Sequence, residues 1–501
     1  MSDTTRNYRK PTLDKDLDKL GYMEEAVGAL GRRYVAPGLA LLFIALCALL
    51  AGVWLTGHAG GPTIAVAAVI GAYMALNIGA NDVANNMGPA VGSRALSLGA
   101  ALVIAAIFES AGALVAGGDV VETVAKGIVA PETIADSATF MAVMLSALMA
   151  SALWINLATW IGAPVSTTHA IVGGVVGAGI TAAGVSAVDW STMGGIAASW
   201  VISPVMGGVI AAAALAFVKT FIIYRDDKIA AARRWVPVLI AVMAGVFAAY
   251  LAKKGLGRIT HIGLGEACLA GLAVGIVFWL VSVPMIRRDA RGLENRNQSL
   301  RALFNMPLVA SAALLSFAHG ANDVANAVGP LAAIVHTAEF GDVATAVDIP
   351  IWVMVVGALG ISLGLILFGP RLIQMVGGQI TKLNPMRAYC VALSAGVTVL
   401  VASALGLPVS STHIAVGAVF GVGFFREWYT ERSKRRVAHV NKHRINPAKK
   451  VRPVRDREEQ RRRRLVRRAH FTTIVAAWIV TVPSAAAISS LIFLAVRLVW
   501  S

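Results

Sequence analysis

The chain has 501 residues, of which 57% are hydrophobic and only 14% are charged. A water-soluble domain does not stay in solution with this composition, so soluble enzymes and soluble binding proteins are excluded. The formal net charge is +17 at pH 7, but much of the excess lies between Arg426 and Arg468, directly before an apolar segment. We interpret that basic segment as a cytoplasmic anchor and expect no nucleic-acid partner.

Apolar runs long enough to cross a bilayer recur along the chain. A helix needs about 20 apolar residues for this, and such runs predict an all-α fold: a polytopic transmembrane helical bundle of about ten to twelve helices. The runs lie near residues 37–57, 63–80, 95–117, 139–162, 170–184, 191–218, 236–252, 262–285, 302–318, 350–369, 388–406, 414–425 and 471–499. Runs 170–184 and 414–425 are short and follow polar, proline-containing interruptions, which predicts broken or re-entrant helices.

Two features narrow the remaining possibilities. The cysteines Cys47, Cys268 and Cys390 lie in apolar runs without metal-ligand spacing, so we expect neither a disulfide framework nor a zinc site, and no cofactor. The polar first 35 residues contain several basic residues before the first apolar run. This order predicts a retained span and not a removable signal peptide.

Two motifs occur twice in the same order. The sequence GANDVAN at residues 79–85 recurs at residues 320–326, and PVSTTH at 164–169 recurs as PVSSTH at 408–413. The two motifs are offset by nearly the same number of residues, which predicts a duplicated unit.

The repeats divide the chain into seven parts. We predict a cytoplasmic N-terminal segment (1–35), an extra N-terminal transmembrane helix (36–62), a first transport repeat (63–190), linker transmembrane helices (191–301), a second, inverted transport repeat (302–426), a basic cytoplasmic loop (427–470) and a C-terminal transmembrane helix (471–501).

The distribution of Lys and Arg predicts opposite orientations for the two repeats. The loop after the second PVSSTH motif carries the basic block 426–468, whereas the matching stretch 185–190 has no Lys or Arg. Cytoplasmic loops are enriched in these residues, so the two stretches should face opposite sides of the membrane. Two repeats of opposite topology bring equivalent residues together near the midplane. Lys253, Lys254 and Arg258 fit this tracing poorly, because it places them outside.

The GANDVAN copies place polar residues in apolar surroundings. An ionised carboxylate in hydrocarbon is costly, so Asp82 and Asp323 must pair with other groups or face a watery cavity. A carboxylate with nearby amides offers hard oxygen ligands for a small cation such as sodium. The carboxylate would serve equally as a proton acceptor. Helix capping and interhelical hydrogen bonding are the structural alternatives. The amides belong to Asn81, Asn85, Asn322 and Asn326.

Each PVS(T/S)TH copy is rich in hydroxyls and opens an apolar arm. Free backbone N–H groups at a helix N-terminus favour an anion, and the hydroxyls can point at the same target. The structural alternative is that the hydroxyls bond back to the preceding turn. Few Lys or Arg residues interrupt the repeated spans, so co-bound cations would have to offset the charge of an anion, which favours symport. The hydroxyls belong to Ser166, Thr167, Thr168, Ser410, Ser411 and Thr412.

Four further ionisable residues lie in apolar segments. Glu109, in the sequence FESAGA, is a candidate coupling group, with a structural carboxyl at a helix break as the alternative. His169 and His413 could relay protons, although a histidine bonded to a neighbouring carbonyl is the commoner case. His319 aligns with Ile78 and so breaks the symmetry between the repeats.

The pattern GANDVANNMGP, FESAGA, KGI and PVSTTH, followed by GANDVANAVGP and PVSSTH, resembles the inorganic phosphate transporter (PiT) family, over roughly residues 63–426 and the last helix. The resemblance implies a permease for inorganic phosphate driven by sodium or protons, with two GAND loops and two PVS(T/S)TH loops at the central site. By position, the aspartates and asparagines would couple ions and contact substrate, and the six hydroxyls would hold phosphate oxygens. Some members carry a second glutamate, for which the place here is Ala392, leaving Glu109 without a counterpart.

We therefore expect a phosphate:cation symporter that works by alternating access in the plasma (inner) membrane. Its N-terminus and the 427–470 loop would be cytoplasmic, its partners would be inorganic phosphate, sodium or protons and the lipid bilayer, and a homodimer is possible. A sulfate permease on the same scaffold is the nearest rival, because both anions are tetrahedral. An intramembrane hydrolase using His169 or His413 is disfavoured, since it lacks a nucleophile motif and leaves the duplication unexplained.

Overall fold

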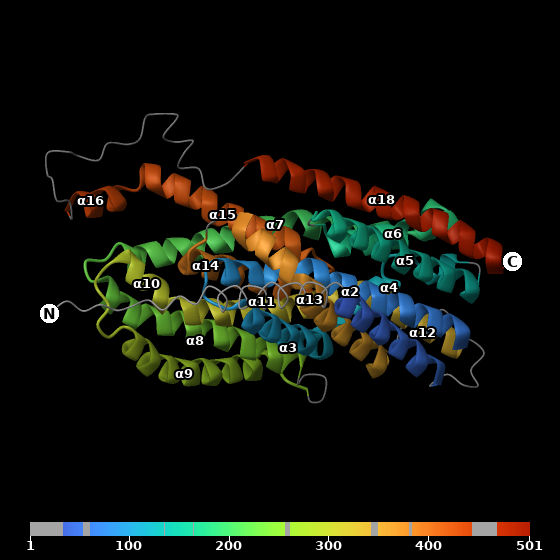
Figure 1. Cartoon of the computed structure of the whole chain (residues 1–501), viewed down its shortest axis with the longest axis horizontal. Coiled ribbons are helices and arrows are strands. Elements are labelled where there is room, and N and C mark those ends of the chain that lie inside the picture. Colours follow the sequence, from blue (N-terminus) through green and yellow to red (C-terminus); the bar gives the residue numbers. More distant parts are fainter. Residues whose placement is uncertain are drawn as a thin grey trace, which may run out of the picture.

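The computed structural model describes residues 34–53, 61–134, 136–163, 165–255, 261–341, 349–379, 383–442 and 468–500, and within them the chain is almost entirely helical (Figure 1). In the described part, ten helices are long and apolar enough to span a membrane, or eleven if a pair bent by 47° counts as one span. The predicted all-α transmembrane bundle and its number of spans are confirmed.

The helices follow the predicted runs closely. They are an N-terminal helix (Tyr34–Val53), α2 (Gly61–Gly92), α3 (Leu98–Ala116), α4 (Gly118–Lys126), α5 (Ser137–Ile161), α6 (Thr167–Ala183), α7 (Trp190–Val218), α8 (Lys228–Lys254), α9 (Leu264–Asp289), α10 (Asn297–Leu303), α11 (Asn305–Asp323), α12 (Ala325–Phe340), α13 (Ile351–Gln379), α14 (Pro385–Ala404), α15 (Ser411–Arg432), α16 (Lys434–Lys442) and α18 (Arg468–Trp500). Single turns of other helix types are η1 (Pro131–Thr133), η2 (Val185–Ala187) and η3 (Lys219–Ile223).

The GANDVAN motifs lie inside helices, and the expectation that they form loops is wrong. The first copy lies within α2, which continues to Gly92, well beyond the predicted end at residue 80. The second copy is interrupted only at Val324, between α11 and α12. The asparagine and aspartate side chains of both copies bond to other helices, so they do not compete with the helical backbone bonds of their own segment.

Two helical hairpins carry the PVS(T/S)TH motifs at their tips. The α5–α6 hairpin comes from one end of the bundle and the α14–α15 hairpin from the other (Figure 1). Each hairpin turns at a left-handed glycine, Gly162 (φ 73°) or Gly406 (φ 67°), a conformation that other residues rarely adopt. As predicted, α6 with 17 residues is too short to cross a bilayer alone. The second arm, α15, is longer than predicted and ends at Arg432.

The helices beside the GANDVAN segments pack in matching pairs. A Cβ on Gly79 of α2 would lie 1.9 Å from the Ile361 carbonyl oxygen of α13, and a Cβ on Gly320 of α11 would lie 2.0 Å from the Glu109 carbonyl oxygen of α3. The hydroxyls of Ser110 and Ser362 lie 2.6 Å apart, where α3 meets α13. These contacts make Ile361 the counterpart of Glu109. The expectation that Ala392 is the counterpart of Glu109 is therefore wrong, although Glu109 still has no acidic counterpart.

The second hairpin arms also have matching partners. Gly417 of α15 packs against the backbone of Pro204 in α7, and Gly173 of α6 packs against the backbone of Val482 in α18. Gly173 and Gly417 are separated by the same offset as the two PVS(T/S)TH motifs. Helix α7, which the sequence placed in the linker, therefore holds the same position beside α15 that the C-terminal helix α18 holds beside α6.

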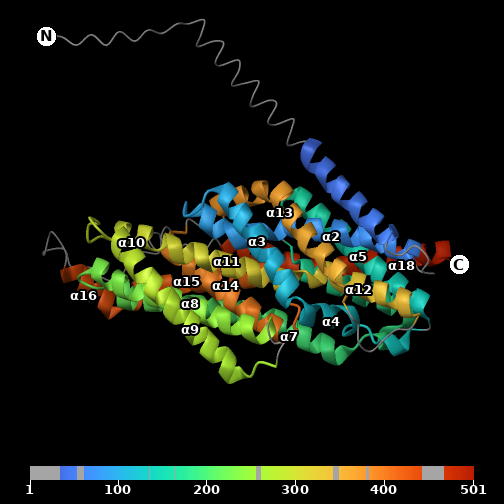
Figure 2. The ribbon, with the colours of Figure 1, turned by 90° about the horizontal axis from the view of Figure 1, so that it is seen from below.

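Two further helices flank the bundle. The N-terminal helix lies alongside α2 and α13, where Phe43 and Cys47 pack against Leu76 and Val356 (Figure 2). On another side of the bundle, α8 packs Phe247 against Phe317 of α11, with ring centroids 4.9 Å apart.

Candidate functional site

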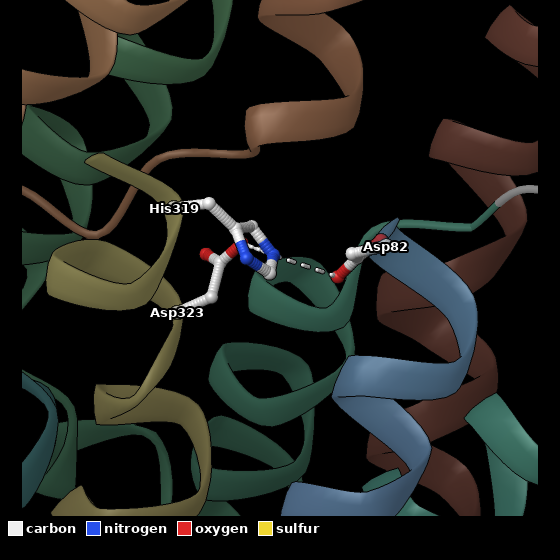
Figure 3. Close-up of side chains that lie close together, drawn as sticks. All are labelled: Asp82, His319 and Asp323. Carbon is white, nitrogen blue, oxygen red and sulfur yellow. Dashed lines mark ion pairs between the residues drawn. The ribbon is translucent and has the colours of Figure 1, made fainter. Parts of the chain in front are cut away.

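The aspartates of the two GANDVAN motifs converge on one histidine at the centre of the bundle. His319 Nε2 lies 2.8 Å from an Asp323 carboxylate oxygen and 3.7 Å from an Asp82 carboxylate oxygen (Figure 3). All three side chains are buried. His319 precedes Asp323 by four residues on α11, so both point to the same side of the helix. The structure thus brings the two predicted ion-coupling aspartates together.

Hydroxyls from both hairpin tips donate hydrogen bonds to these aspartates. Asp82 accepts one from Thr167 (3.0 Å) and one from Thr412 (3.1 Å). Each aspartate therefore takes one hydroxyl from its own repeat and one from the other repeat. The corresponding donors to Asp323 are Ser411 at 2.8 Å and Thr168 at 3.4 Å, and the Thr168 hydroxyl also lies 3.0 Å from the Val409 carbonyl oxygen.

The amides of Asn85 and Asn326 extend this network. Asn85 donates to the Thr412 hydroxyl (2.8 Å), and Asn326 donates to the hydroxyls of Thr167 (3.3 Å) and Thr168 (3.2 Å). The Asn326 side chain is buried, and its carbonyl oxygen has no hydrogen-bond partner among the described residues. The Asn326 amide nitrogen lies 3.5 Å from an Asp323 carboxylate oxygen, so this unsatisfied acceptor belongs to a side chain next to the aspartate.

Asn81 and Asn322 connect the GANDVAN helices to the hairpins. Asn81 donates to the Thr159 hydroxyl (2.9 Å). Asn322 donates to the Ser403 hydroxyl (3.0 Å) and the Leu407 carbonyl (3.1 Å), and accepts from the Val409 N–H (3.2 Å). These are the interhelical hydrogen bonds that the sequence offered as an alternative, and direct contact with a substrate stays a prediction for both residues.

The first hydroxyl of each motif caps a helix. Ser166 accepts from the His169 N–H (3.1 Å) at the start of α6, and Ser410 accepts from the His413 N–H (3.3 Å) at the start of α15. Such caps fix where each helix begins and which way the next two hydroxyls point. Binding of phosphate oxygens by these two serines stays a prediction.

The histidines that end the motifs lie against each other. The ring of His169 is 4.4 Å from that of His413 and 3.8 Å from the ring of Trp200, measured between centroids. Neither nitrogen of His169 has a hydrogen-bond partner among the described residues. The structure therefore shows aromatic packing for His169 in place of the carbonyl partner expected from the sequence.

Glu109 joins the aspartates through His319. Its carboxylate accepts from the Asn86 amide (2.8 Å) and lies 3.4 Å from His319 Nδ1. The sequence identified Glu109 but missed Asn86, and it treated His319 only as a departure from symmetry. The spacing of His319 and Asp323 was a usable signal for a shared helix face. Nothing in the sequence pointed from Asn86 to Glu109.

The site combines three carboxylates with hydroxyls and amides. Asp82, His319 and Asp323 each offer a ligand atom, and these atoms lie within 4.8 Å of one another. Oxygen donors suit a hard cation such as sodium, whereas the imidazole nitrogen does not. Because an anion is repelled by uncompensated carboxylates in a medium of low dielectric, an oxyanion can bind here only together with positive charge.

Comparison with known proteins agrees with this chemistry. The model of the phosphate transporter family matches residues 78–489. A Helicobacter pylori protein named "Putative phosphate permease" is 52% identical over 420 residues, covering 83% of this chain and 79% of its own length. A chloroplastic inorganic phosphate transporter of Arabidopsis thaliana is 39% identical over 388 residues, covering 72% of this chain and 65% of its own. The solved structure of a sodium-dependent phosphate transporter is 34% identical and superposes with a TM-score of 0.76, covering 87% of this chain and 99% of that one. The chain therefore belongs to the phosphate transporter family.

Proposed function

We propose that this protein is a secondary active transporter that carries inorganic phosphate together with sodium. The observation that supports this most strongly is the pair of buried aspartates, each bonded by hydroxyls from both repeats. Phosphate comes from the family and from the names of the relatives, and sodium from the name of the solved structure. The oxygen-rich site supports sodium, because carboxylates and hydroxyls are the ligands that such an ion prefers.

The hydrogen bonds at the site provide a coupling mechanism. The hydroxyls of Thr167, Thr412 and Ser411 donate to Asp82 and Asp323, so their protons are not available to an anion. The Thr168 hydroxyl is shared between the Val409 carbonyl and Asp323. A sodium ion bound to a carboxylate replaces the hydrogen bond, and the released hydroxyl can then donate to a phosphate oxygen. Sodium binding thus both neutralises the carboxylates and creates the donors for phosphate. This order makes phosphate binding depend on the cation.

We further propose that the two repeats are inverted and exchange access to the site between the two sides of the membrane. Early in α2, Gly71 lies against Leu331 of α12. Later in α2, Asp82 lies near His319 of α11, which precedes Leu331 in the chain. The two GANDVAN segments therefore run in opposite directions, as inverted repeats require. The matching positions of α7 and α18 support repeats wider than the sequence predicted, with each of these helices included.

The distribution of charge supports an orientation. The end of the bundle that contains α10 and α16 (Figure 1) carries many basic residues, among them Arg287, Arg288, Arg291, Arg296 and Arg301. By the positive-inside rule we assign this end to the cytoplasmic face of the plasma (inner) membrane. Residues 1–33 and 443–467 lie outside the described residues, and the cytoplasmic location of the N-terminal segment and the basic loop stays a prediction.

Uptake of radiolabelled phosphate into proteoliposomes tests the proposed function. We expect an inward sodium gradient to drive phosphate above its equilibrium concentration, and a potassium gradient of the same size to fail. Uptake driven equally well by a proton gradient without sodium would replace sodium by protons as the coupling ion. Unlabelled sulfate that competes as strongly as unlabelled phosphate would remove the assignment of phosphate as the preferred anion.

A further inference from the structure

A cavity of about 560 Å³ lies between the N-terminal helix, α2, α5 and α13. One wall is formed by apolar residues of the N-terminal helix, including Pro37, Leu41 and Ile44. The cavity extends to Ala80 and to Thr159, which is the hydrogen-bond partner of Asn81 in the GANDVAN motif. It therefore reaches the edge of the site described above.

The opposite wall carries a series of polar side chains. Asn156 donates to the Asn77 side chain (3.1 Å), and Asn77 precedes Asn81 by one helical turn on α2. Arg371 lines the same cavity and is exposed. Asn156 is also exposed, although it lies on an otherwise apolar membrane helix. Polar groups at such positions are costly in lipid and are expected to face water.

The equivalent positions in the other repeat have lost these polar groups. By the offset between the two PVS(T/S)TH motifs, the counterpart of Asn156 is Leu400. By the offset between the two GANDVAN motifs, the counterpart of Asn77 is Ala318. Both replacements are buried. Phe317, the counterpart of the cavity residue Leu76 by the same motif offset, packs edge to face against Phe247 of α8.

The mouth of that second space is closed. Because Ile361 of α13 is the counterpart of Glu109 of α3, the same offset makes Asp119 the counterpart of Arg371. Asp119 forms an ion pair with Lys254 of α8. Beside this pair, Thr123 donates to the Gly406 carbonyl (2.7 Å) at the turn of the second hairpin. One repeat thus has a largely apolar cavity with a few polar side chains and a cation in its lining, and the other has an aromatic pair behind an ion pair.

We propose that the cavity is the cytoplasmic passage for phosphate, with Arg371 as the residue that attracts the anion at its mouth. The ion pair between Asp119 and Lys254 closes the equivalent passage on the other side. Arg371 lies near the end of α13, and the next helix, α14, packs Tyr389 against Phe304 beside α10, so the mouth opens at the basic end of the bundle. This assignment rests on the proposed function and orientation, and it identifies this structure as a state in which the cytoplasmic passage reaches the edge of the buried site.

Thiol labelling of the full-length protein tests the passage. In a variant with Cys47, Cys268 and Cys390 replaced by alanine, we place single cysteines by Asn156→Cys and, as the matched control, Leu400→Cys. A charged, membrane-impermeant methanethiosulfonate reagent is applied to inside-out and right-side-out vesicles, and labelling is read as a mass shift. We expect N156C to be labelled from the cytoplasmic face at least about tenfold faster than L400C. Thr159→Cys with Ser403→Cys is the second matched pair, should N156C fail to insert.

Labelling does not require transport, so it separates a failure of the passage from a failure of the phosphate function. If N156C and T159C stay unlabelled from the cytoplasmic face, or are labelled faster from the outer face, the passage is refuted.

Substitution of Arg371 tests its attraction for the anion. We expect Arg371→Gln to raise the cytoplasmic phosphate concentration for half-maximal efflux by roughly threefold to tenfold at low salt, with a smaller effect at high salt because ions screen the charge. Arg371→Lys should retain most of the wild-type value. Arg287→Gln removes another exposed cation at the same end and should change little. If R371Q and R287Q behave alike at every salt concentration, Arg371 has no special role.

Discussion

Asp82 and Asp323 are each bonded by hydroxyls of both repeats, so the candidate substrate site is also the contact between the repeats. Hydrogen bonds between membrane helices contribute about 0.6 to 2 kcal/mol each, so the four together are strong enough to influence how the repeats sit against one another. A ligand that replaces these bonds changes the site and the contact at the same time. This links binding to the rearrangement that transport needs.

The Thr412 hydroxyl tests that link. Thr412→Val removes a donor to Asp82 and an acceptor for Asn85, and we expect phosphate uptake to fall by roughly tenfold or more. Thr398→Val is the matched control, because among the residues that the structure describes the Thr398 hydroxyl bonds only to the Ser394 carbonyl of its own helix. Uptake is measured in proteoliposomes containing equal amounts of each variant. Equal losses in both variants would assign the effect to helix packing.

Glu109 tests the link between the aspartates and the third carboxylate. Glu109→Gln keeps an acceptor for Asn86 but removes the charge beside His319, and we expect a higher sodium concentration for half-maximal uptake. Glu122→Gln changes an exposed glutamate that pairs with Lys126 and should have no effect. A sodium dependence that is the same in E109Q and the wild type would exclude Glu109 from coupling.

The sequence predicts which residue types gather at the site but not how they pair. Duplication of the two motifs identified both aspartates and all six hydroxyls. The exchange of hydroxyls between repeats follows from how the hairpin tips cross in space, which no local pattern encodes. The capping role of Ser166 and Ser410 was accessible in principle, since each serine directly precedes the helix that it caps.

Close approach between helices holds the central elements in place. Helix α3 has glycines in two different surroundings: a Cβ on Gly112 would lie 2.0 Å from the Phe317 carbonyl oxygen of α11, whereas a Cβ on Gly99 would meet nothing within 4 Å. We expect Gly112→Ala to destabilise the protein by about 1 to 3 kcal/mol through forced separation of α3 and α11. Gly99→Ala should be neutral or slightly stabilising.

Thermal unfolding in detergent, monitored by size-exclusion chromatography, measures the difference in unfolding temperature between G112A and G99A. Should the two variants unfold at the same temperature, the close packing of α3 on α11 would not contribute to stability.

Hydropathy predicts most of these elements because each span must be apolar along its length. It failed in α2, where we interpreted the polar GANDVAN residues as the end of a helix. Asn81, Asp82 and Asn85 all bond to residues of other helices, and the backbone of α2 is free to continue past them. The assignment of Ala392 as the counterpart of Glu109 failed for a different reason, because only the packing contacts reveal that α13 corresponds to α3.

At the scale of the whole molecule, the basic end of the bundle determines the proposed orientation. Lys253, Lys254 and Arg258 fitted this orientation poorly in the sequence, and Arg258 lies outside the described residues. In the structure Lys254 pairs with Asp119, and Lys253 donates to the Ile262 carbonyl (2.9 Å). These local partners account for two basic residues at the outer face without a change of topology.

Labelling of loop residues tests the orientation directly. In the cysteine-free protein, we expect Asn297→Cys, at the start of α10, to react with an impermeant reagent only from the cytoplasmic face. Glu132→Cys, in the loop before α5, should react only from the outer face, because it lies at the opposite end of the bundle. If both cysteines react from the same face, the proposed topology is wrong.

Phosphate uptake by Asp82→Asn and Asp323→Asn proteoliposomes under an inward sodium gradient tests most directly whether the paired aspartates couple the two solutes. Asparagine preserves the shape of each side chain but removes the charge that would bind the cation. We expect both variants to insert and fold like the wild type and to lose sodium-driven uptake. Near-normal uptake in both variants would contradict the proposed coupling site.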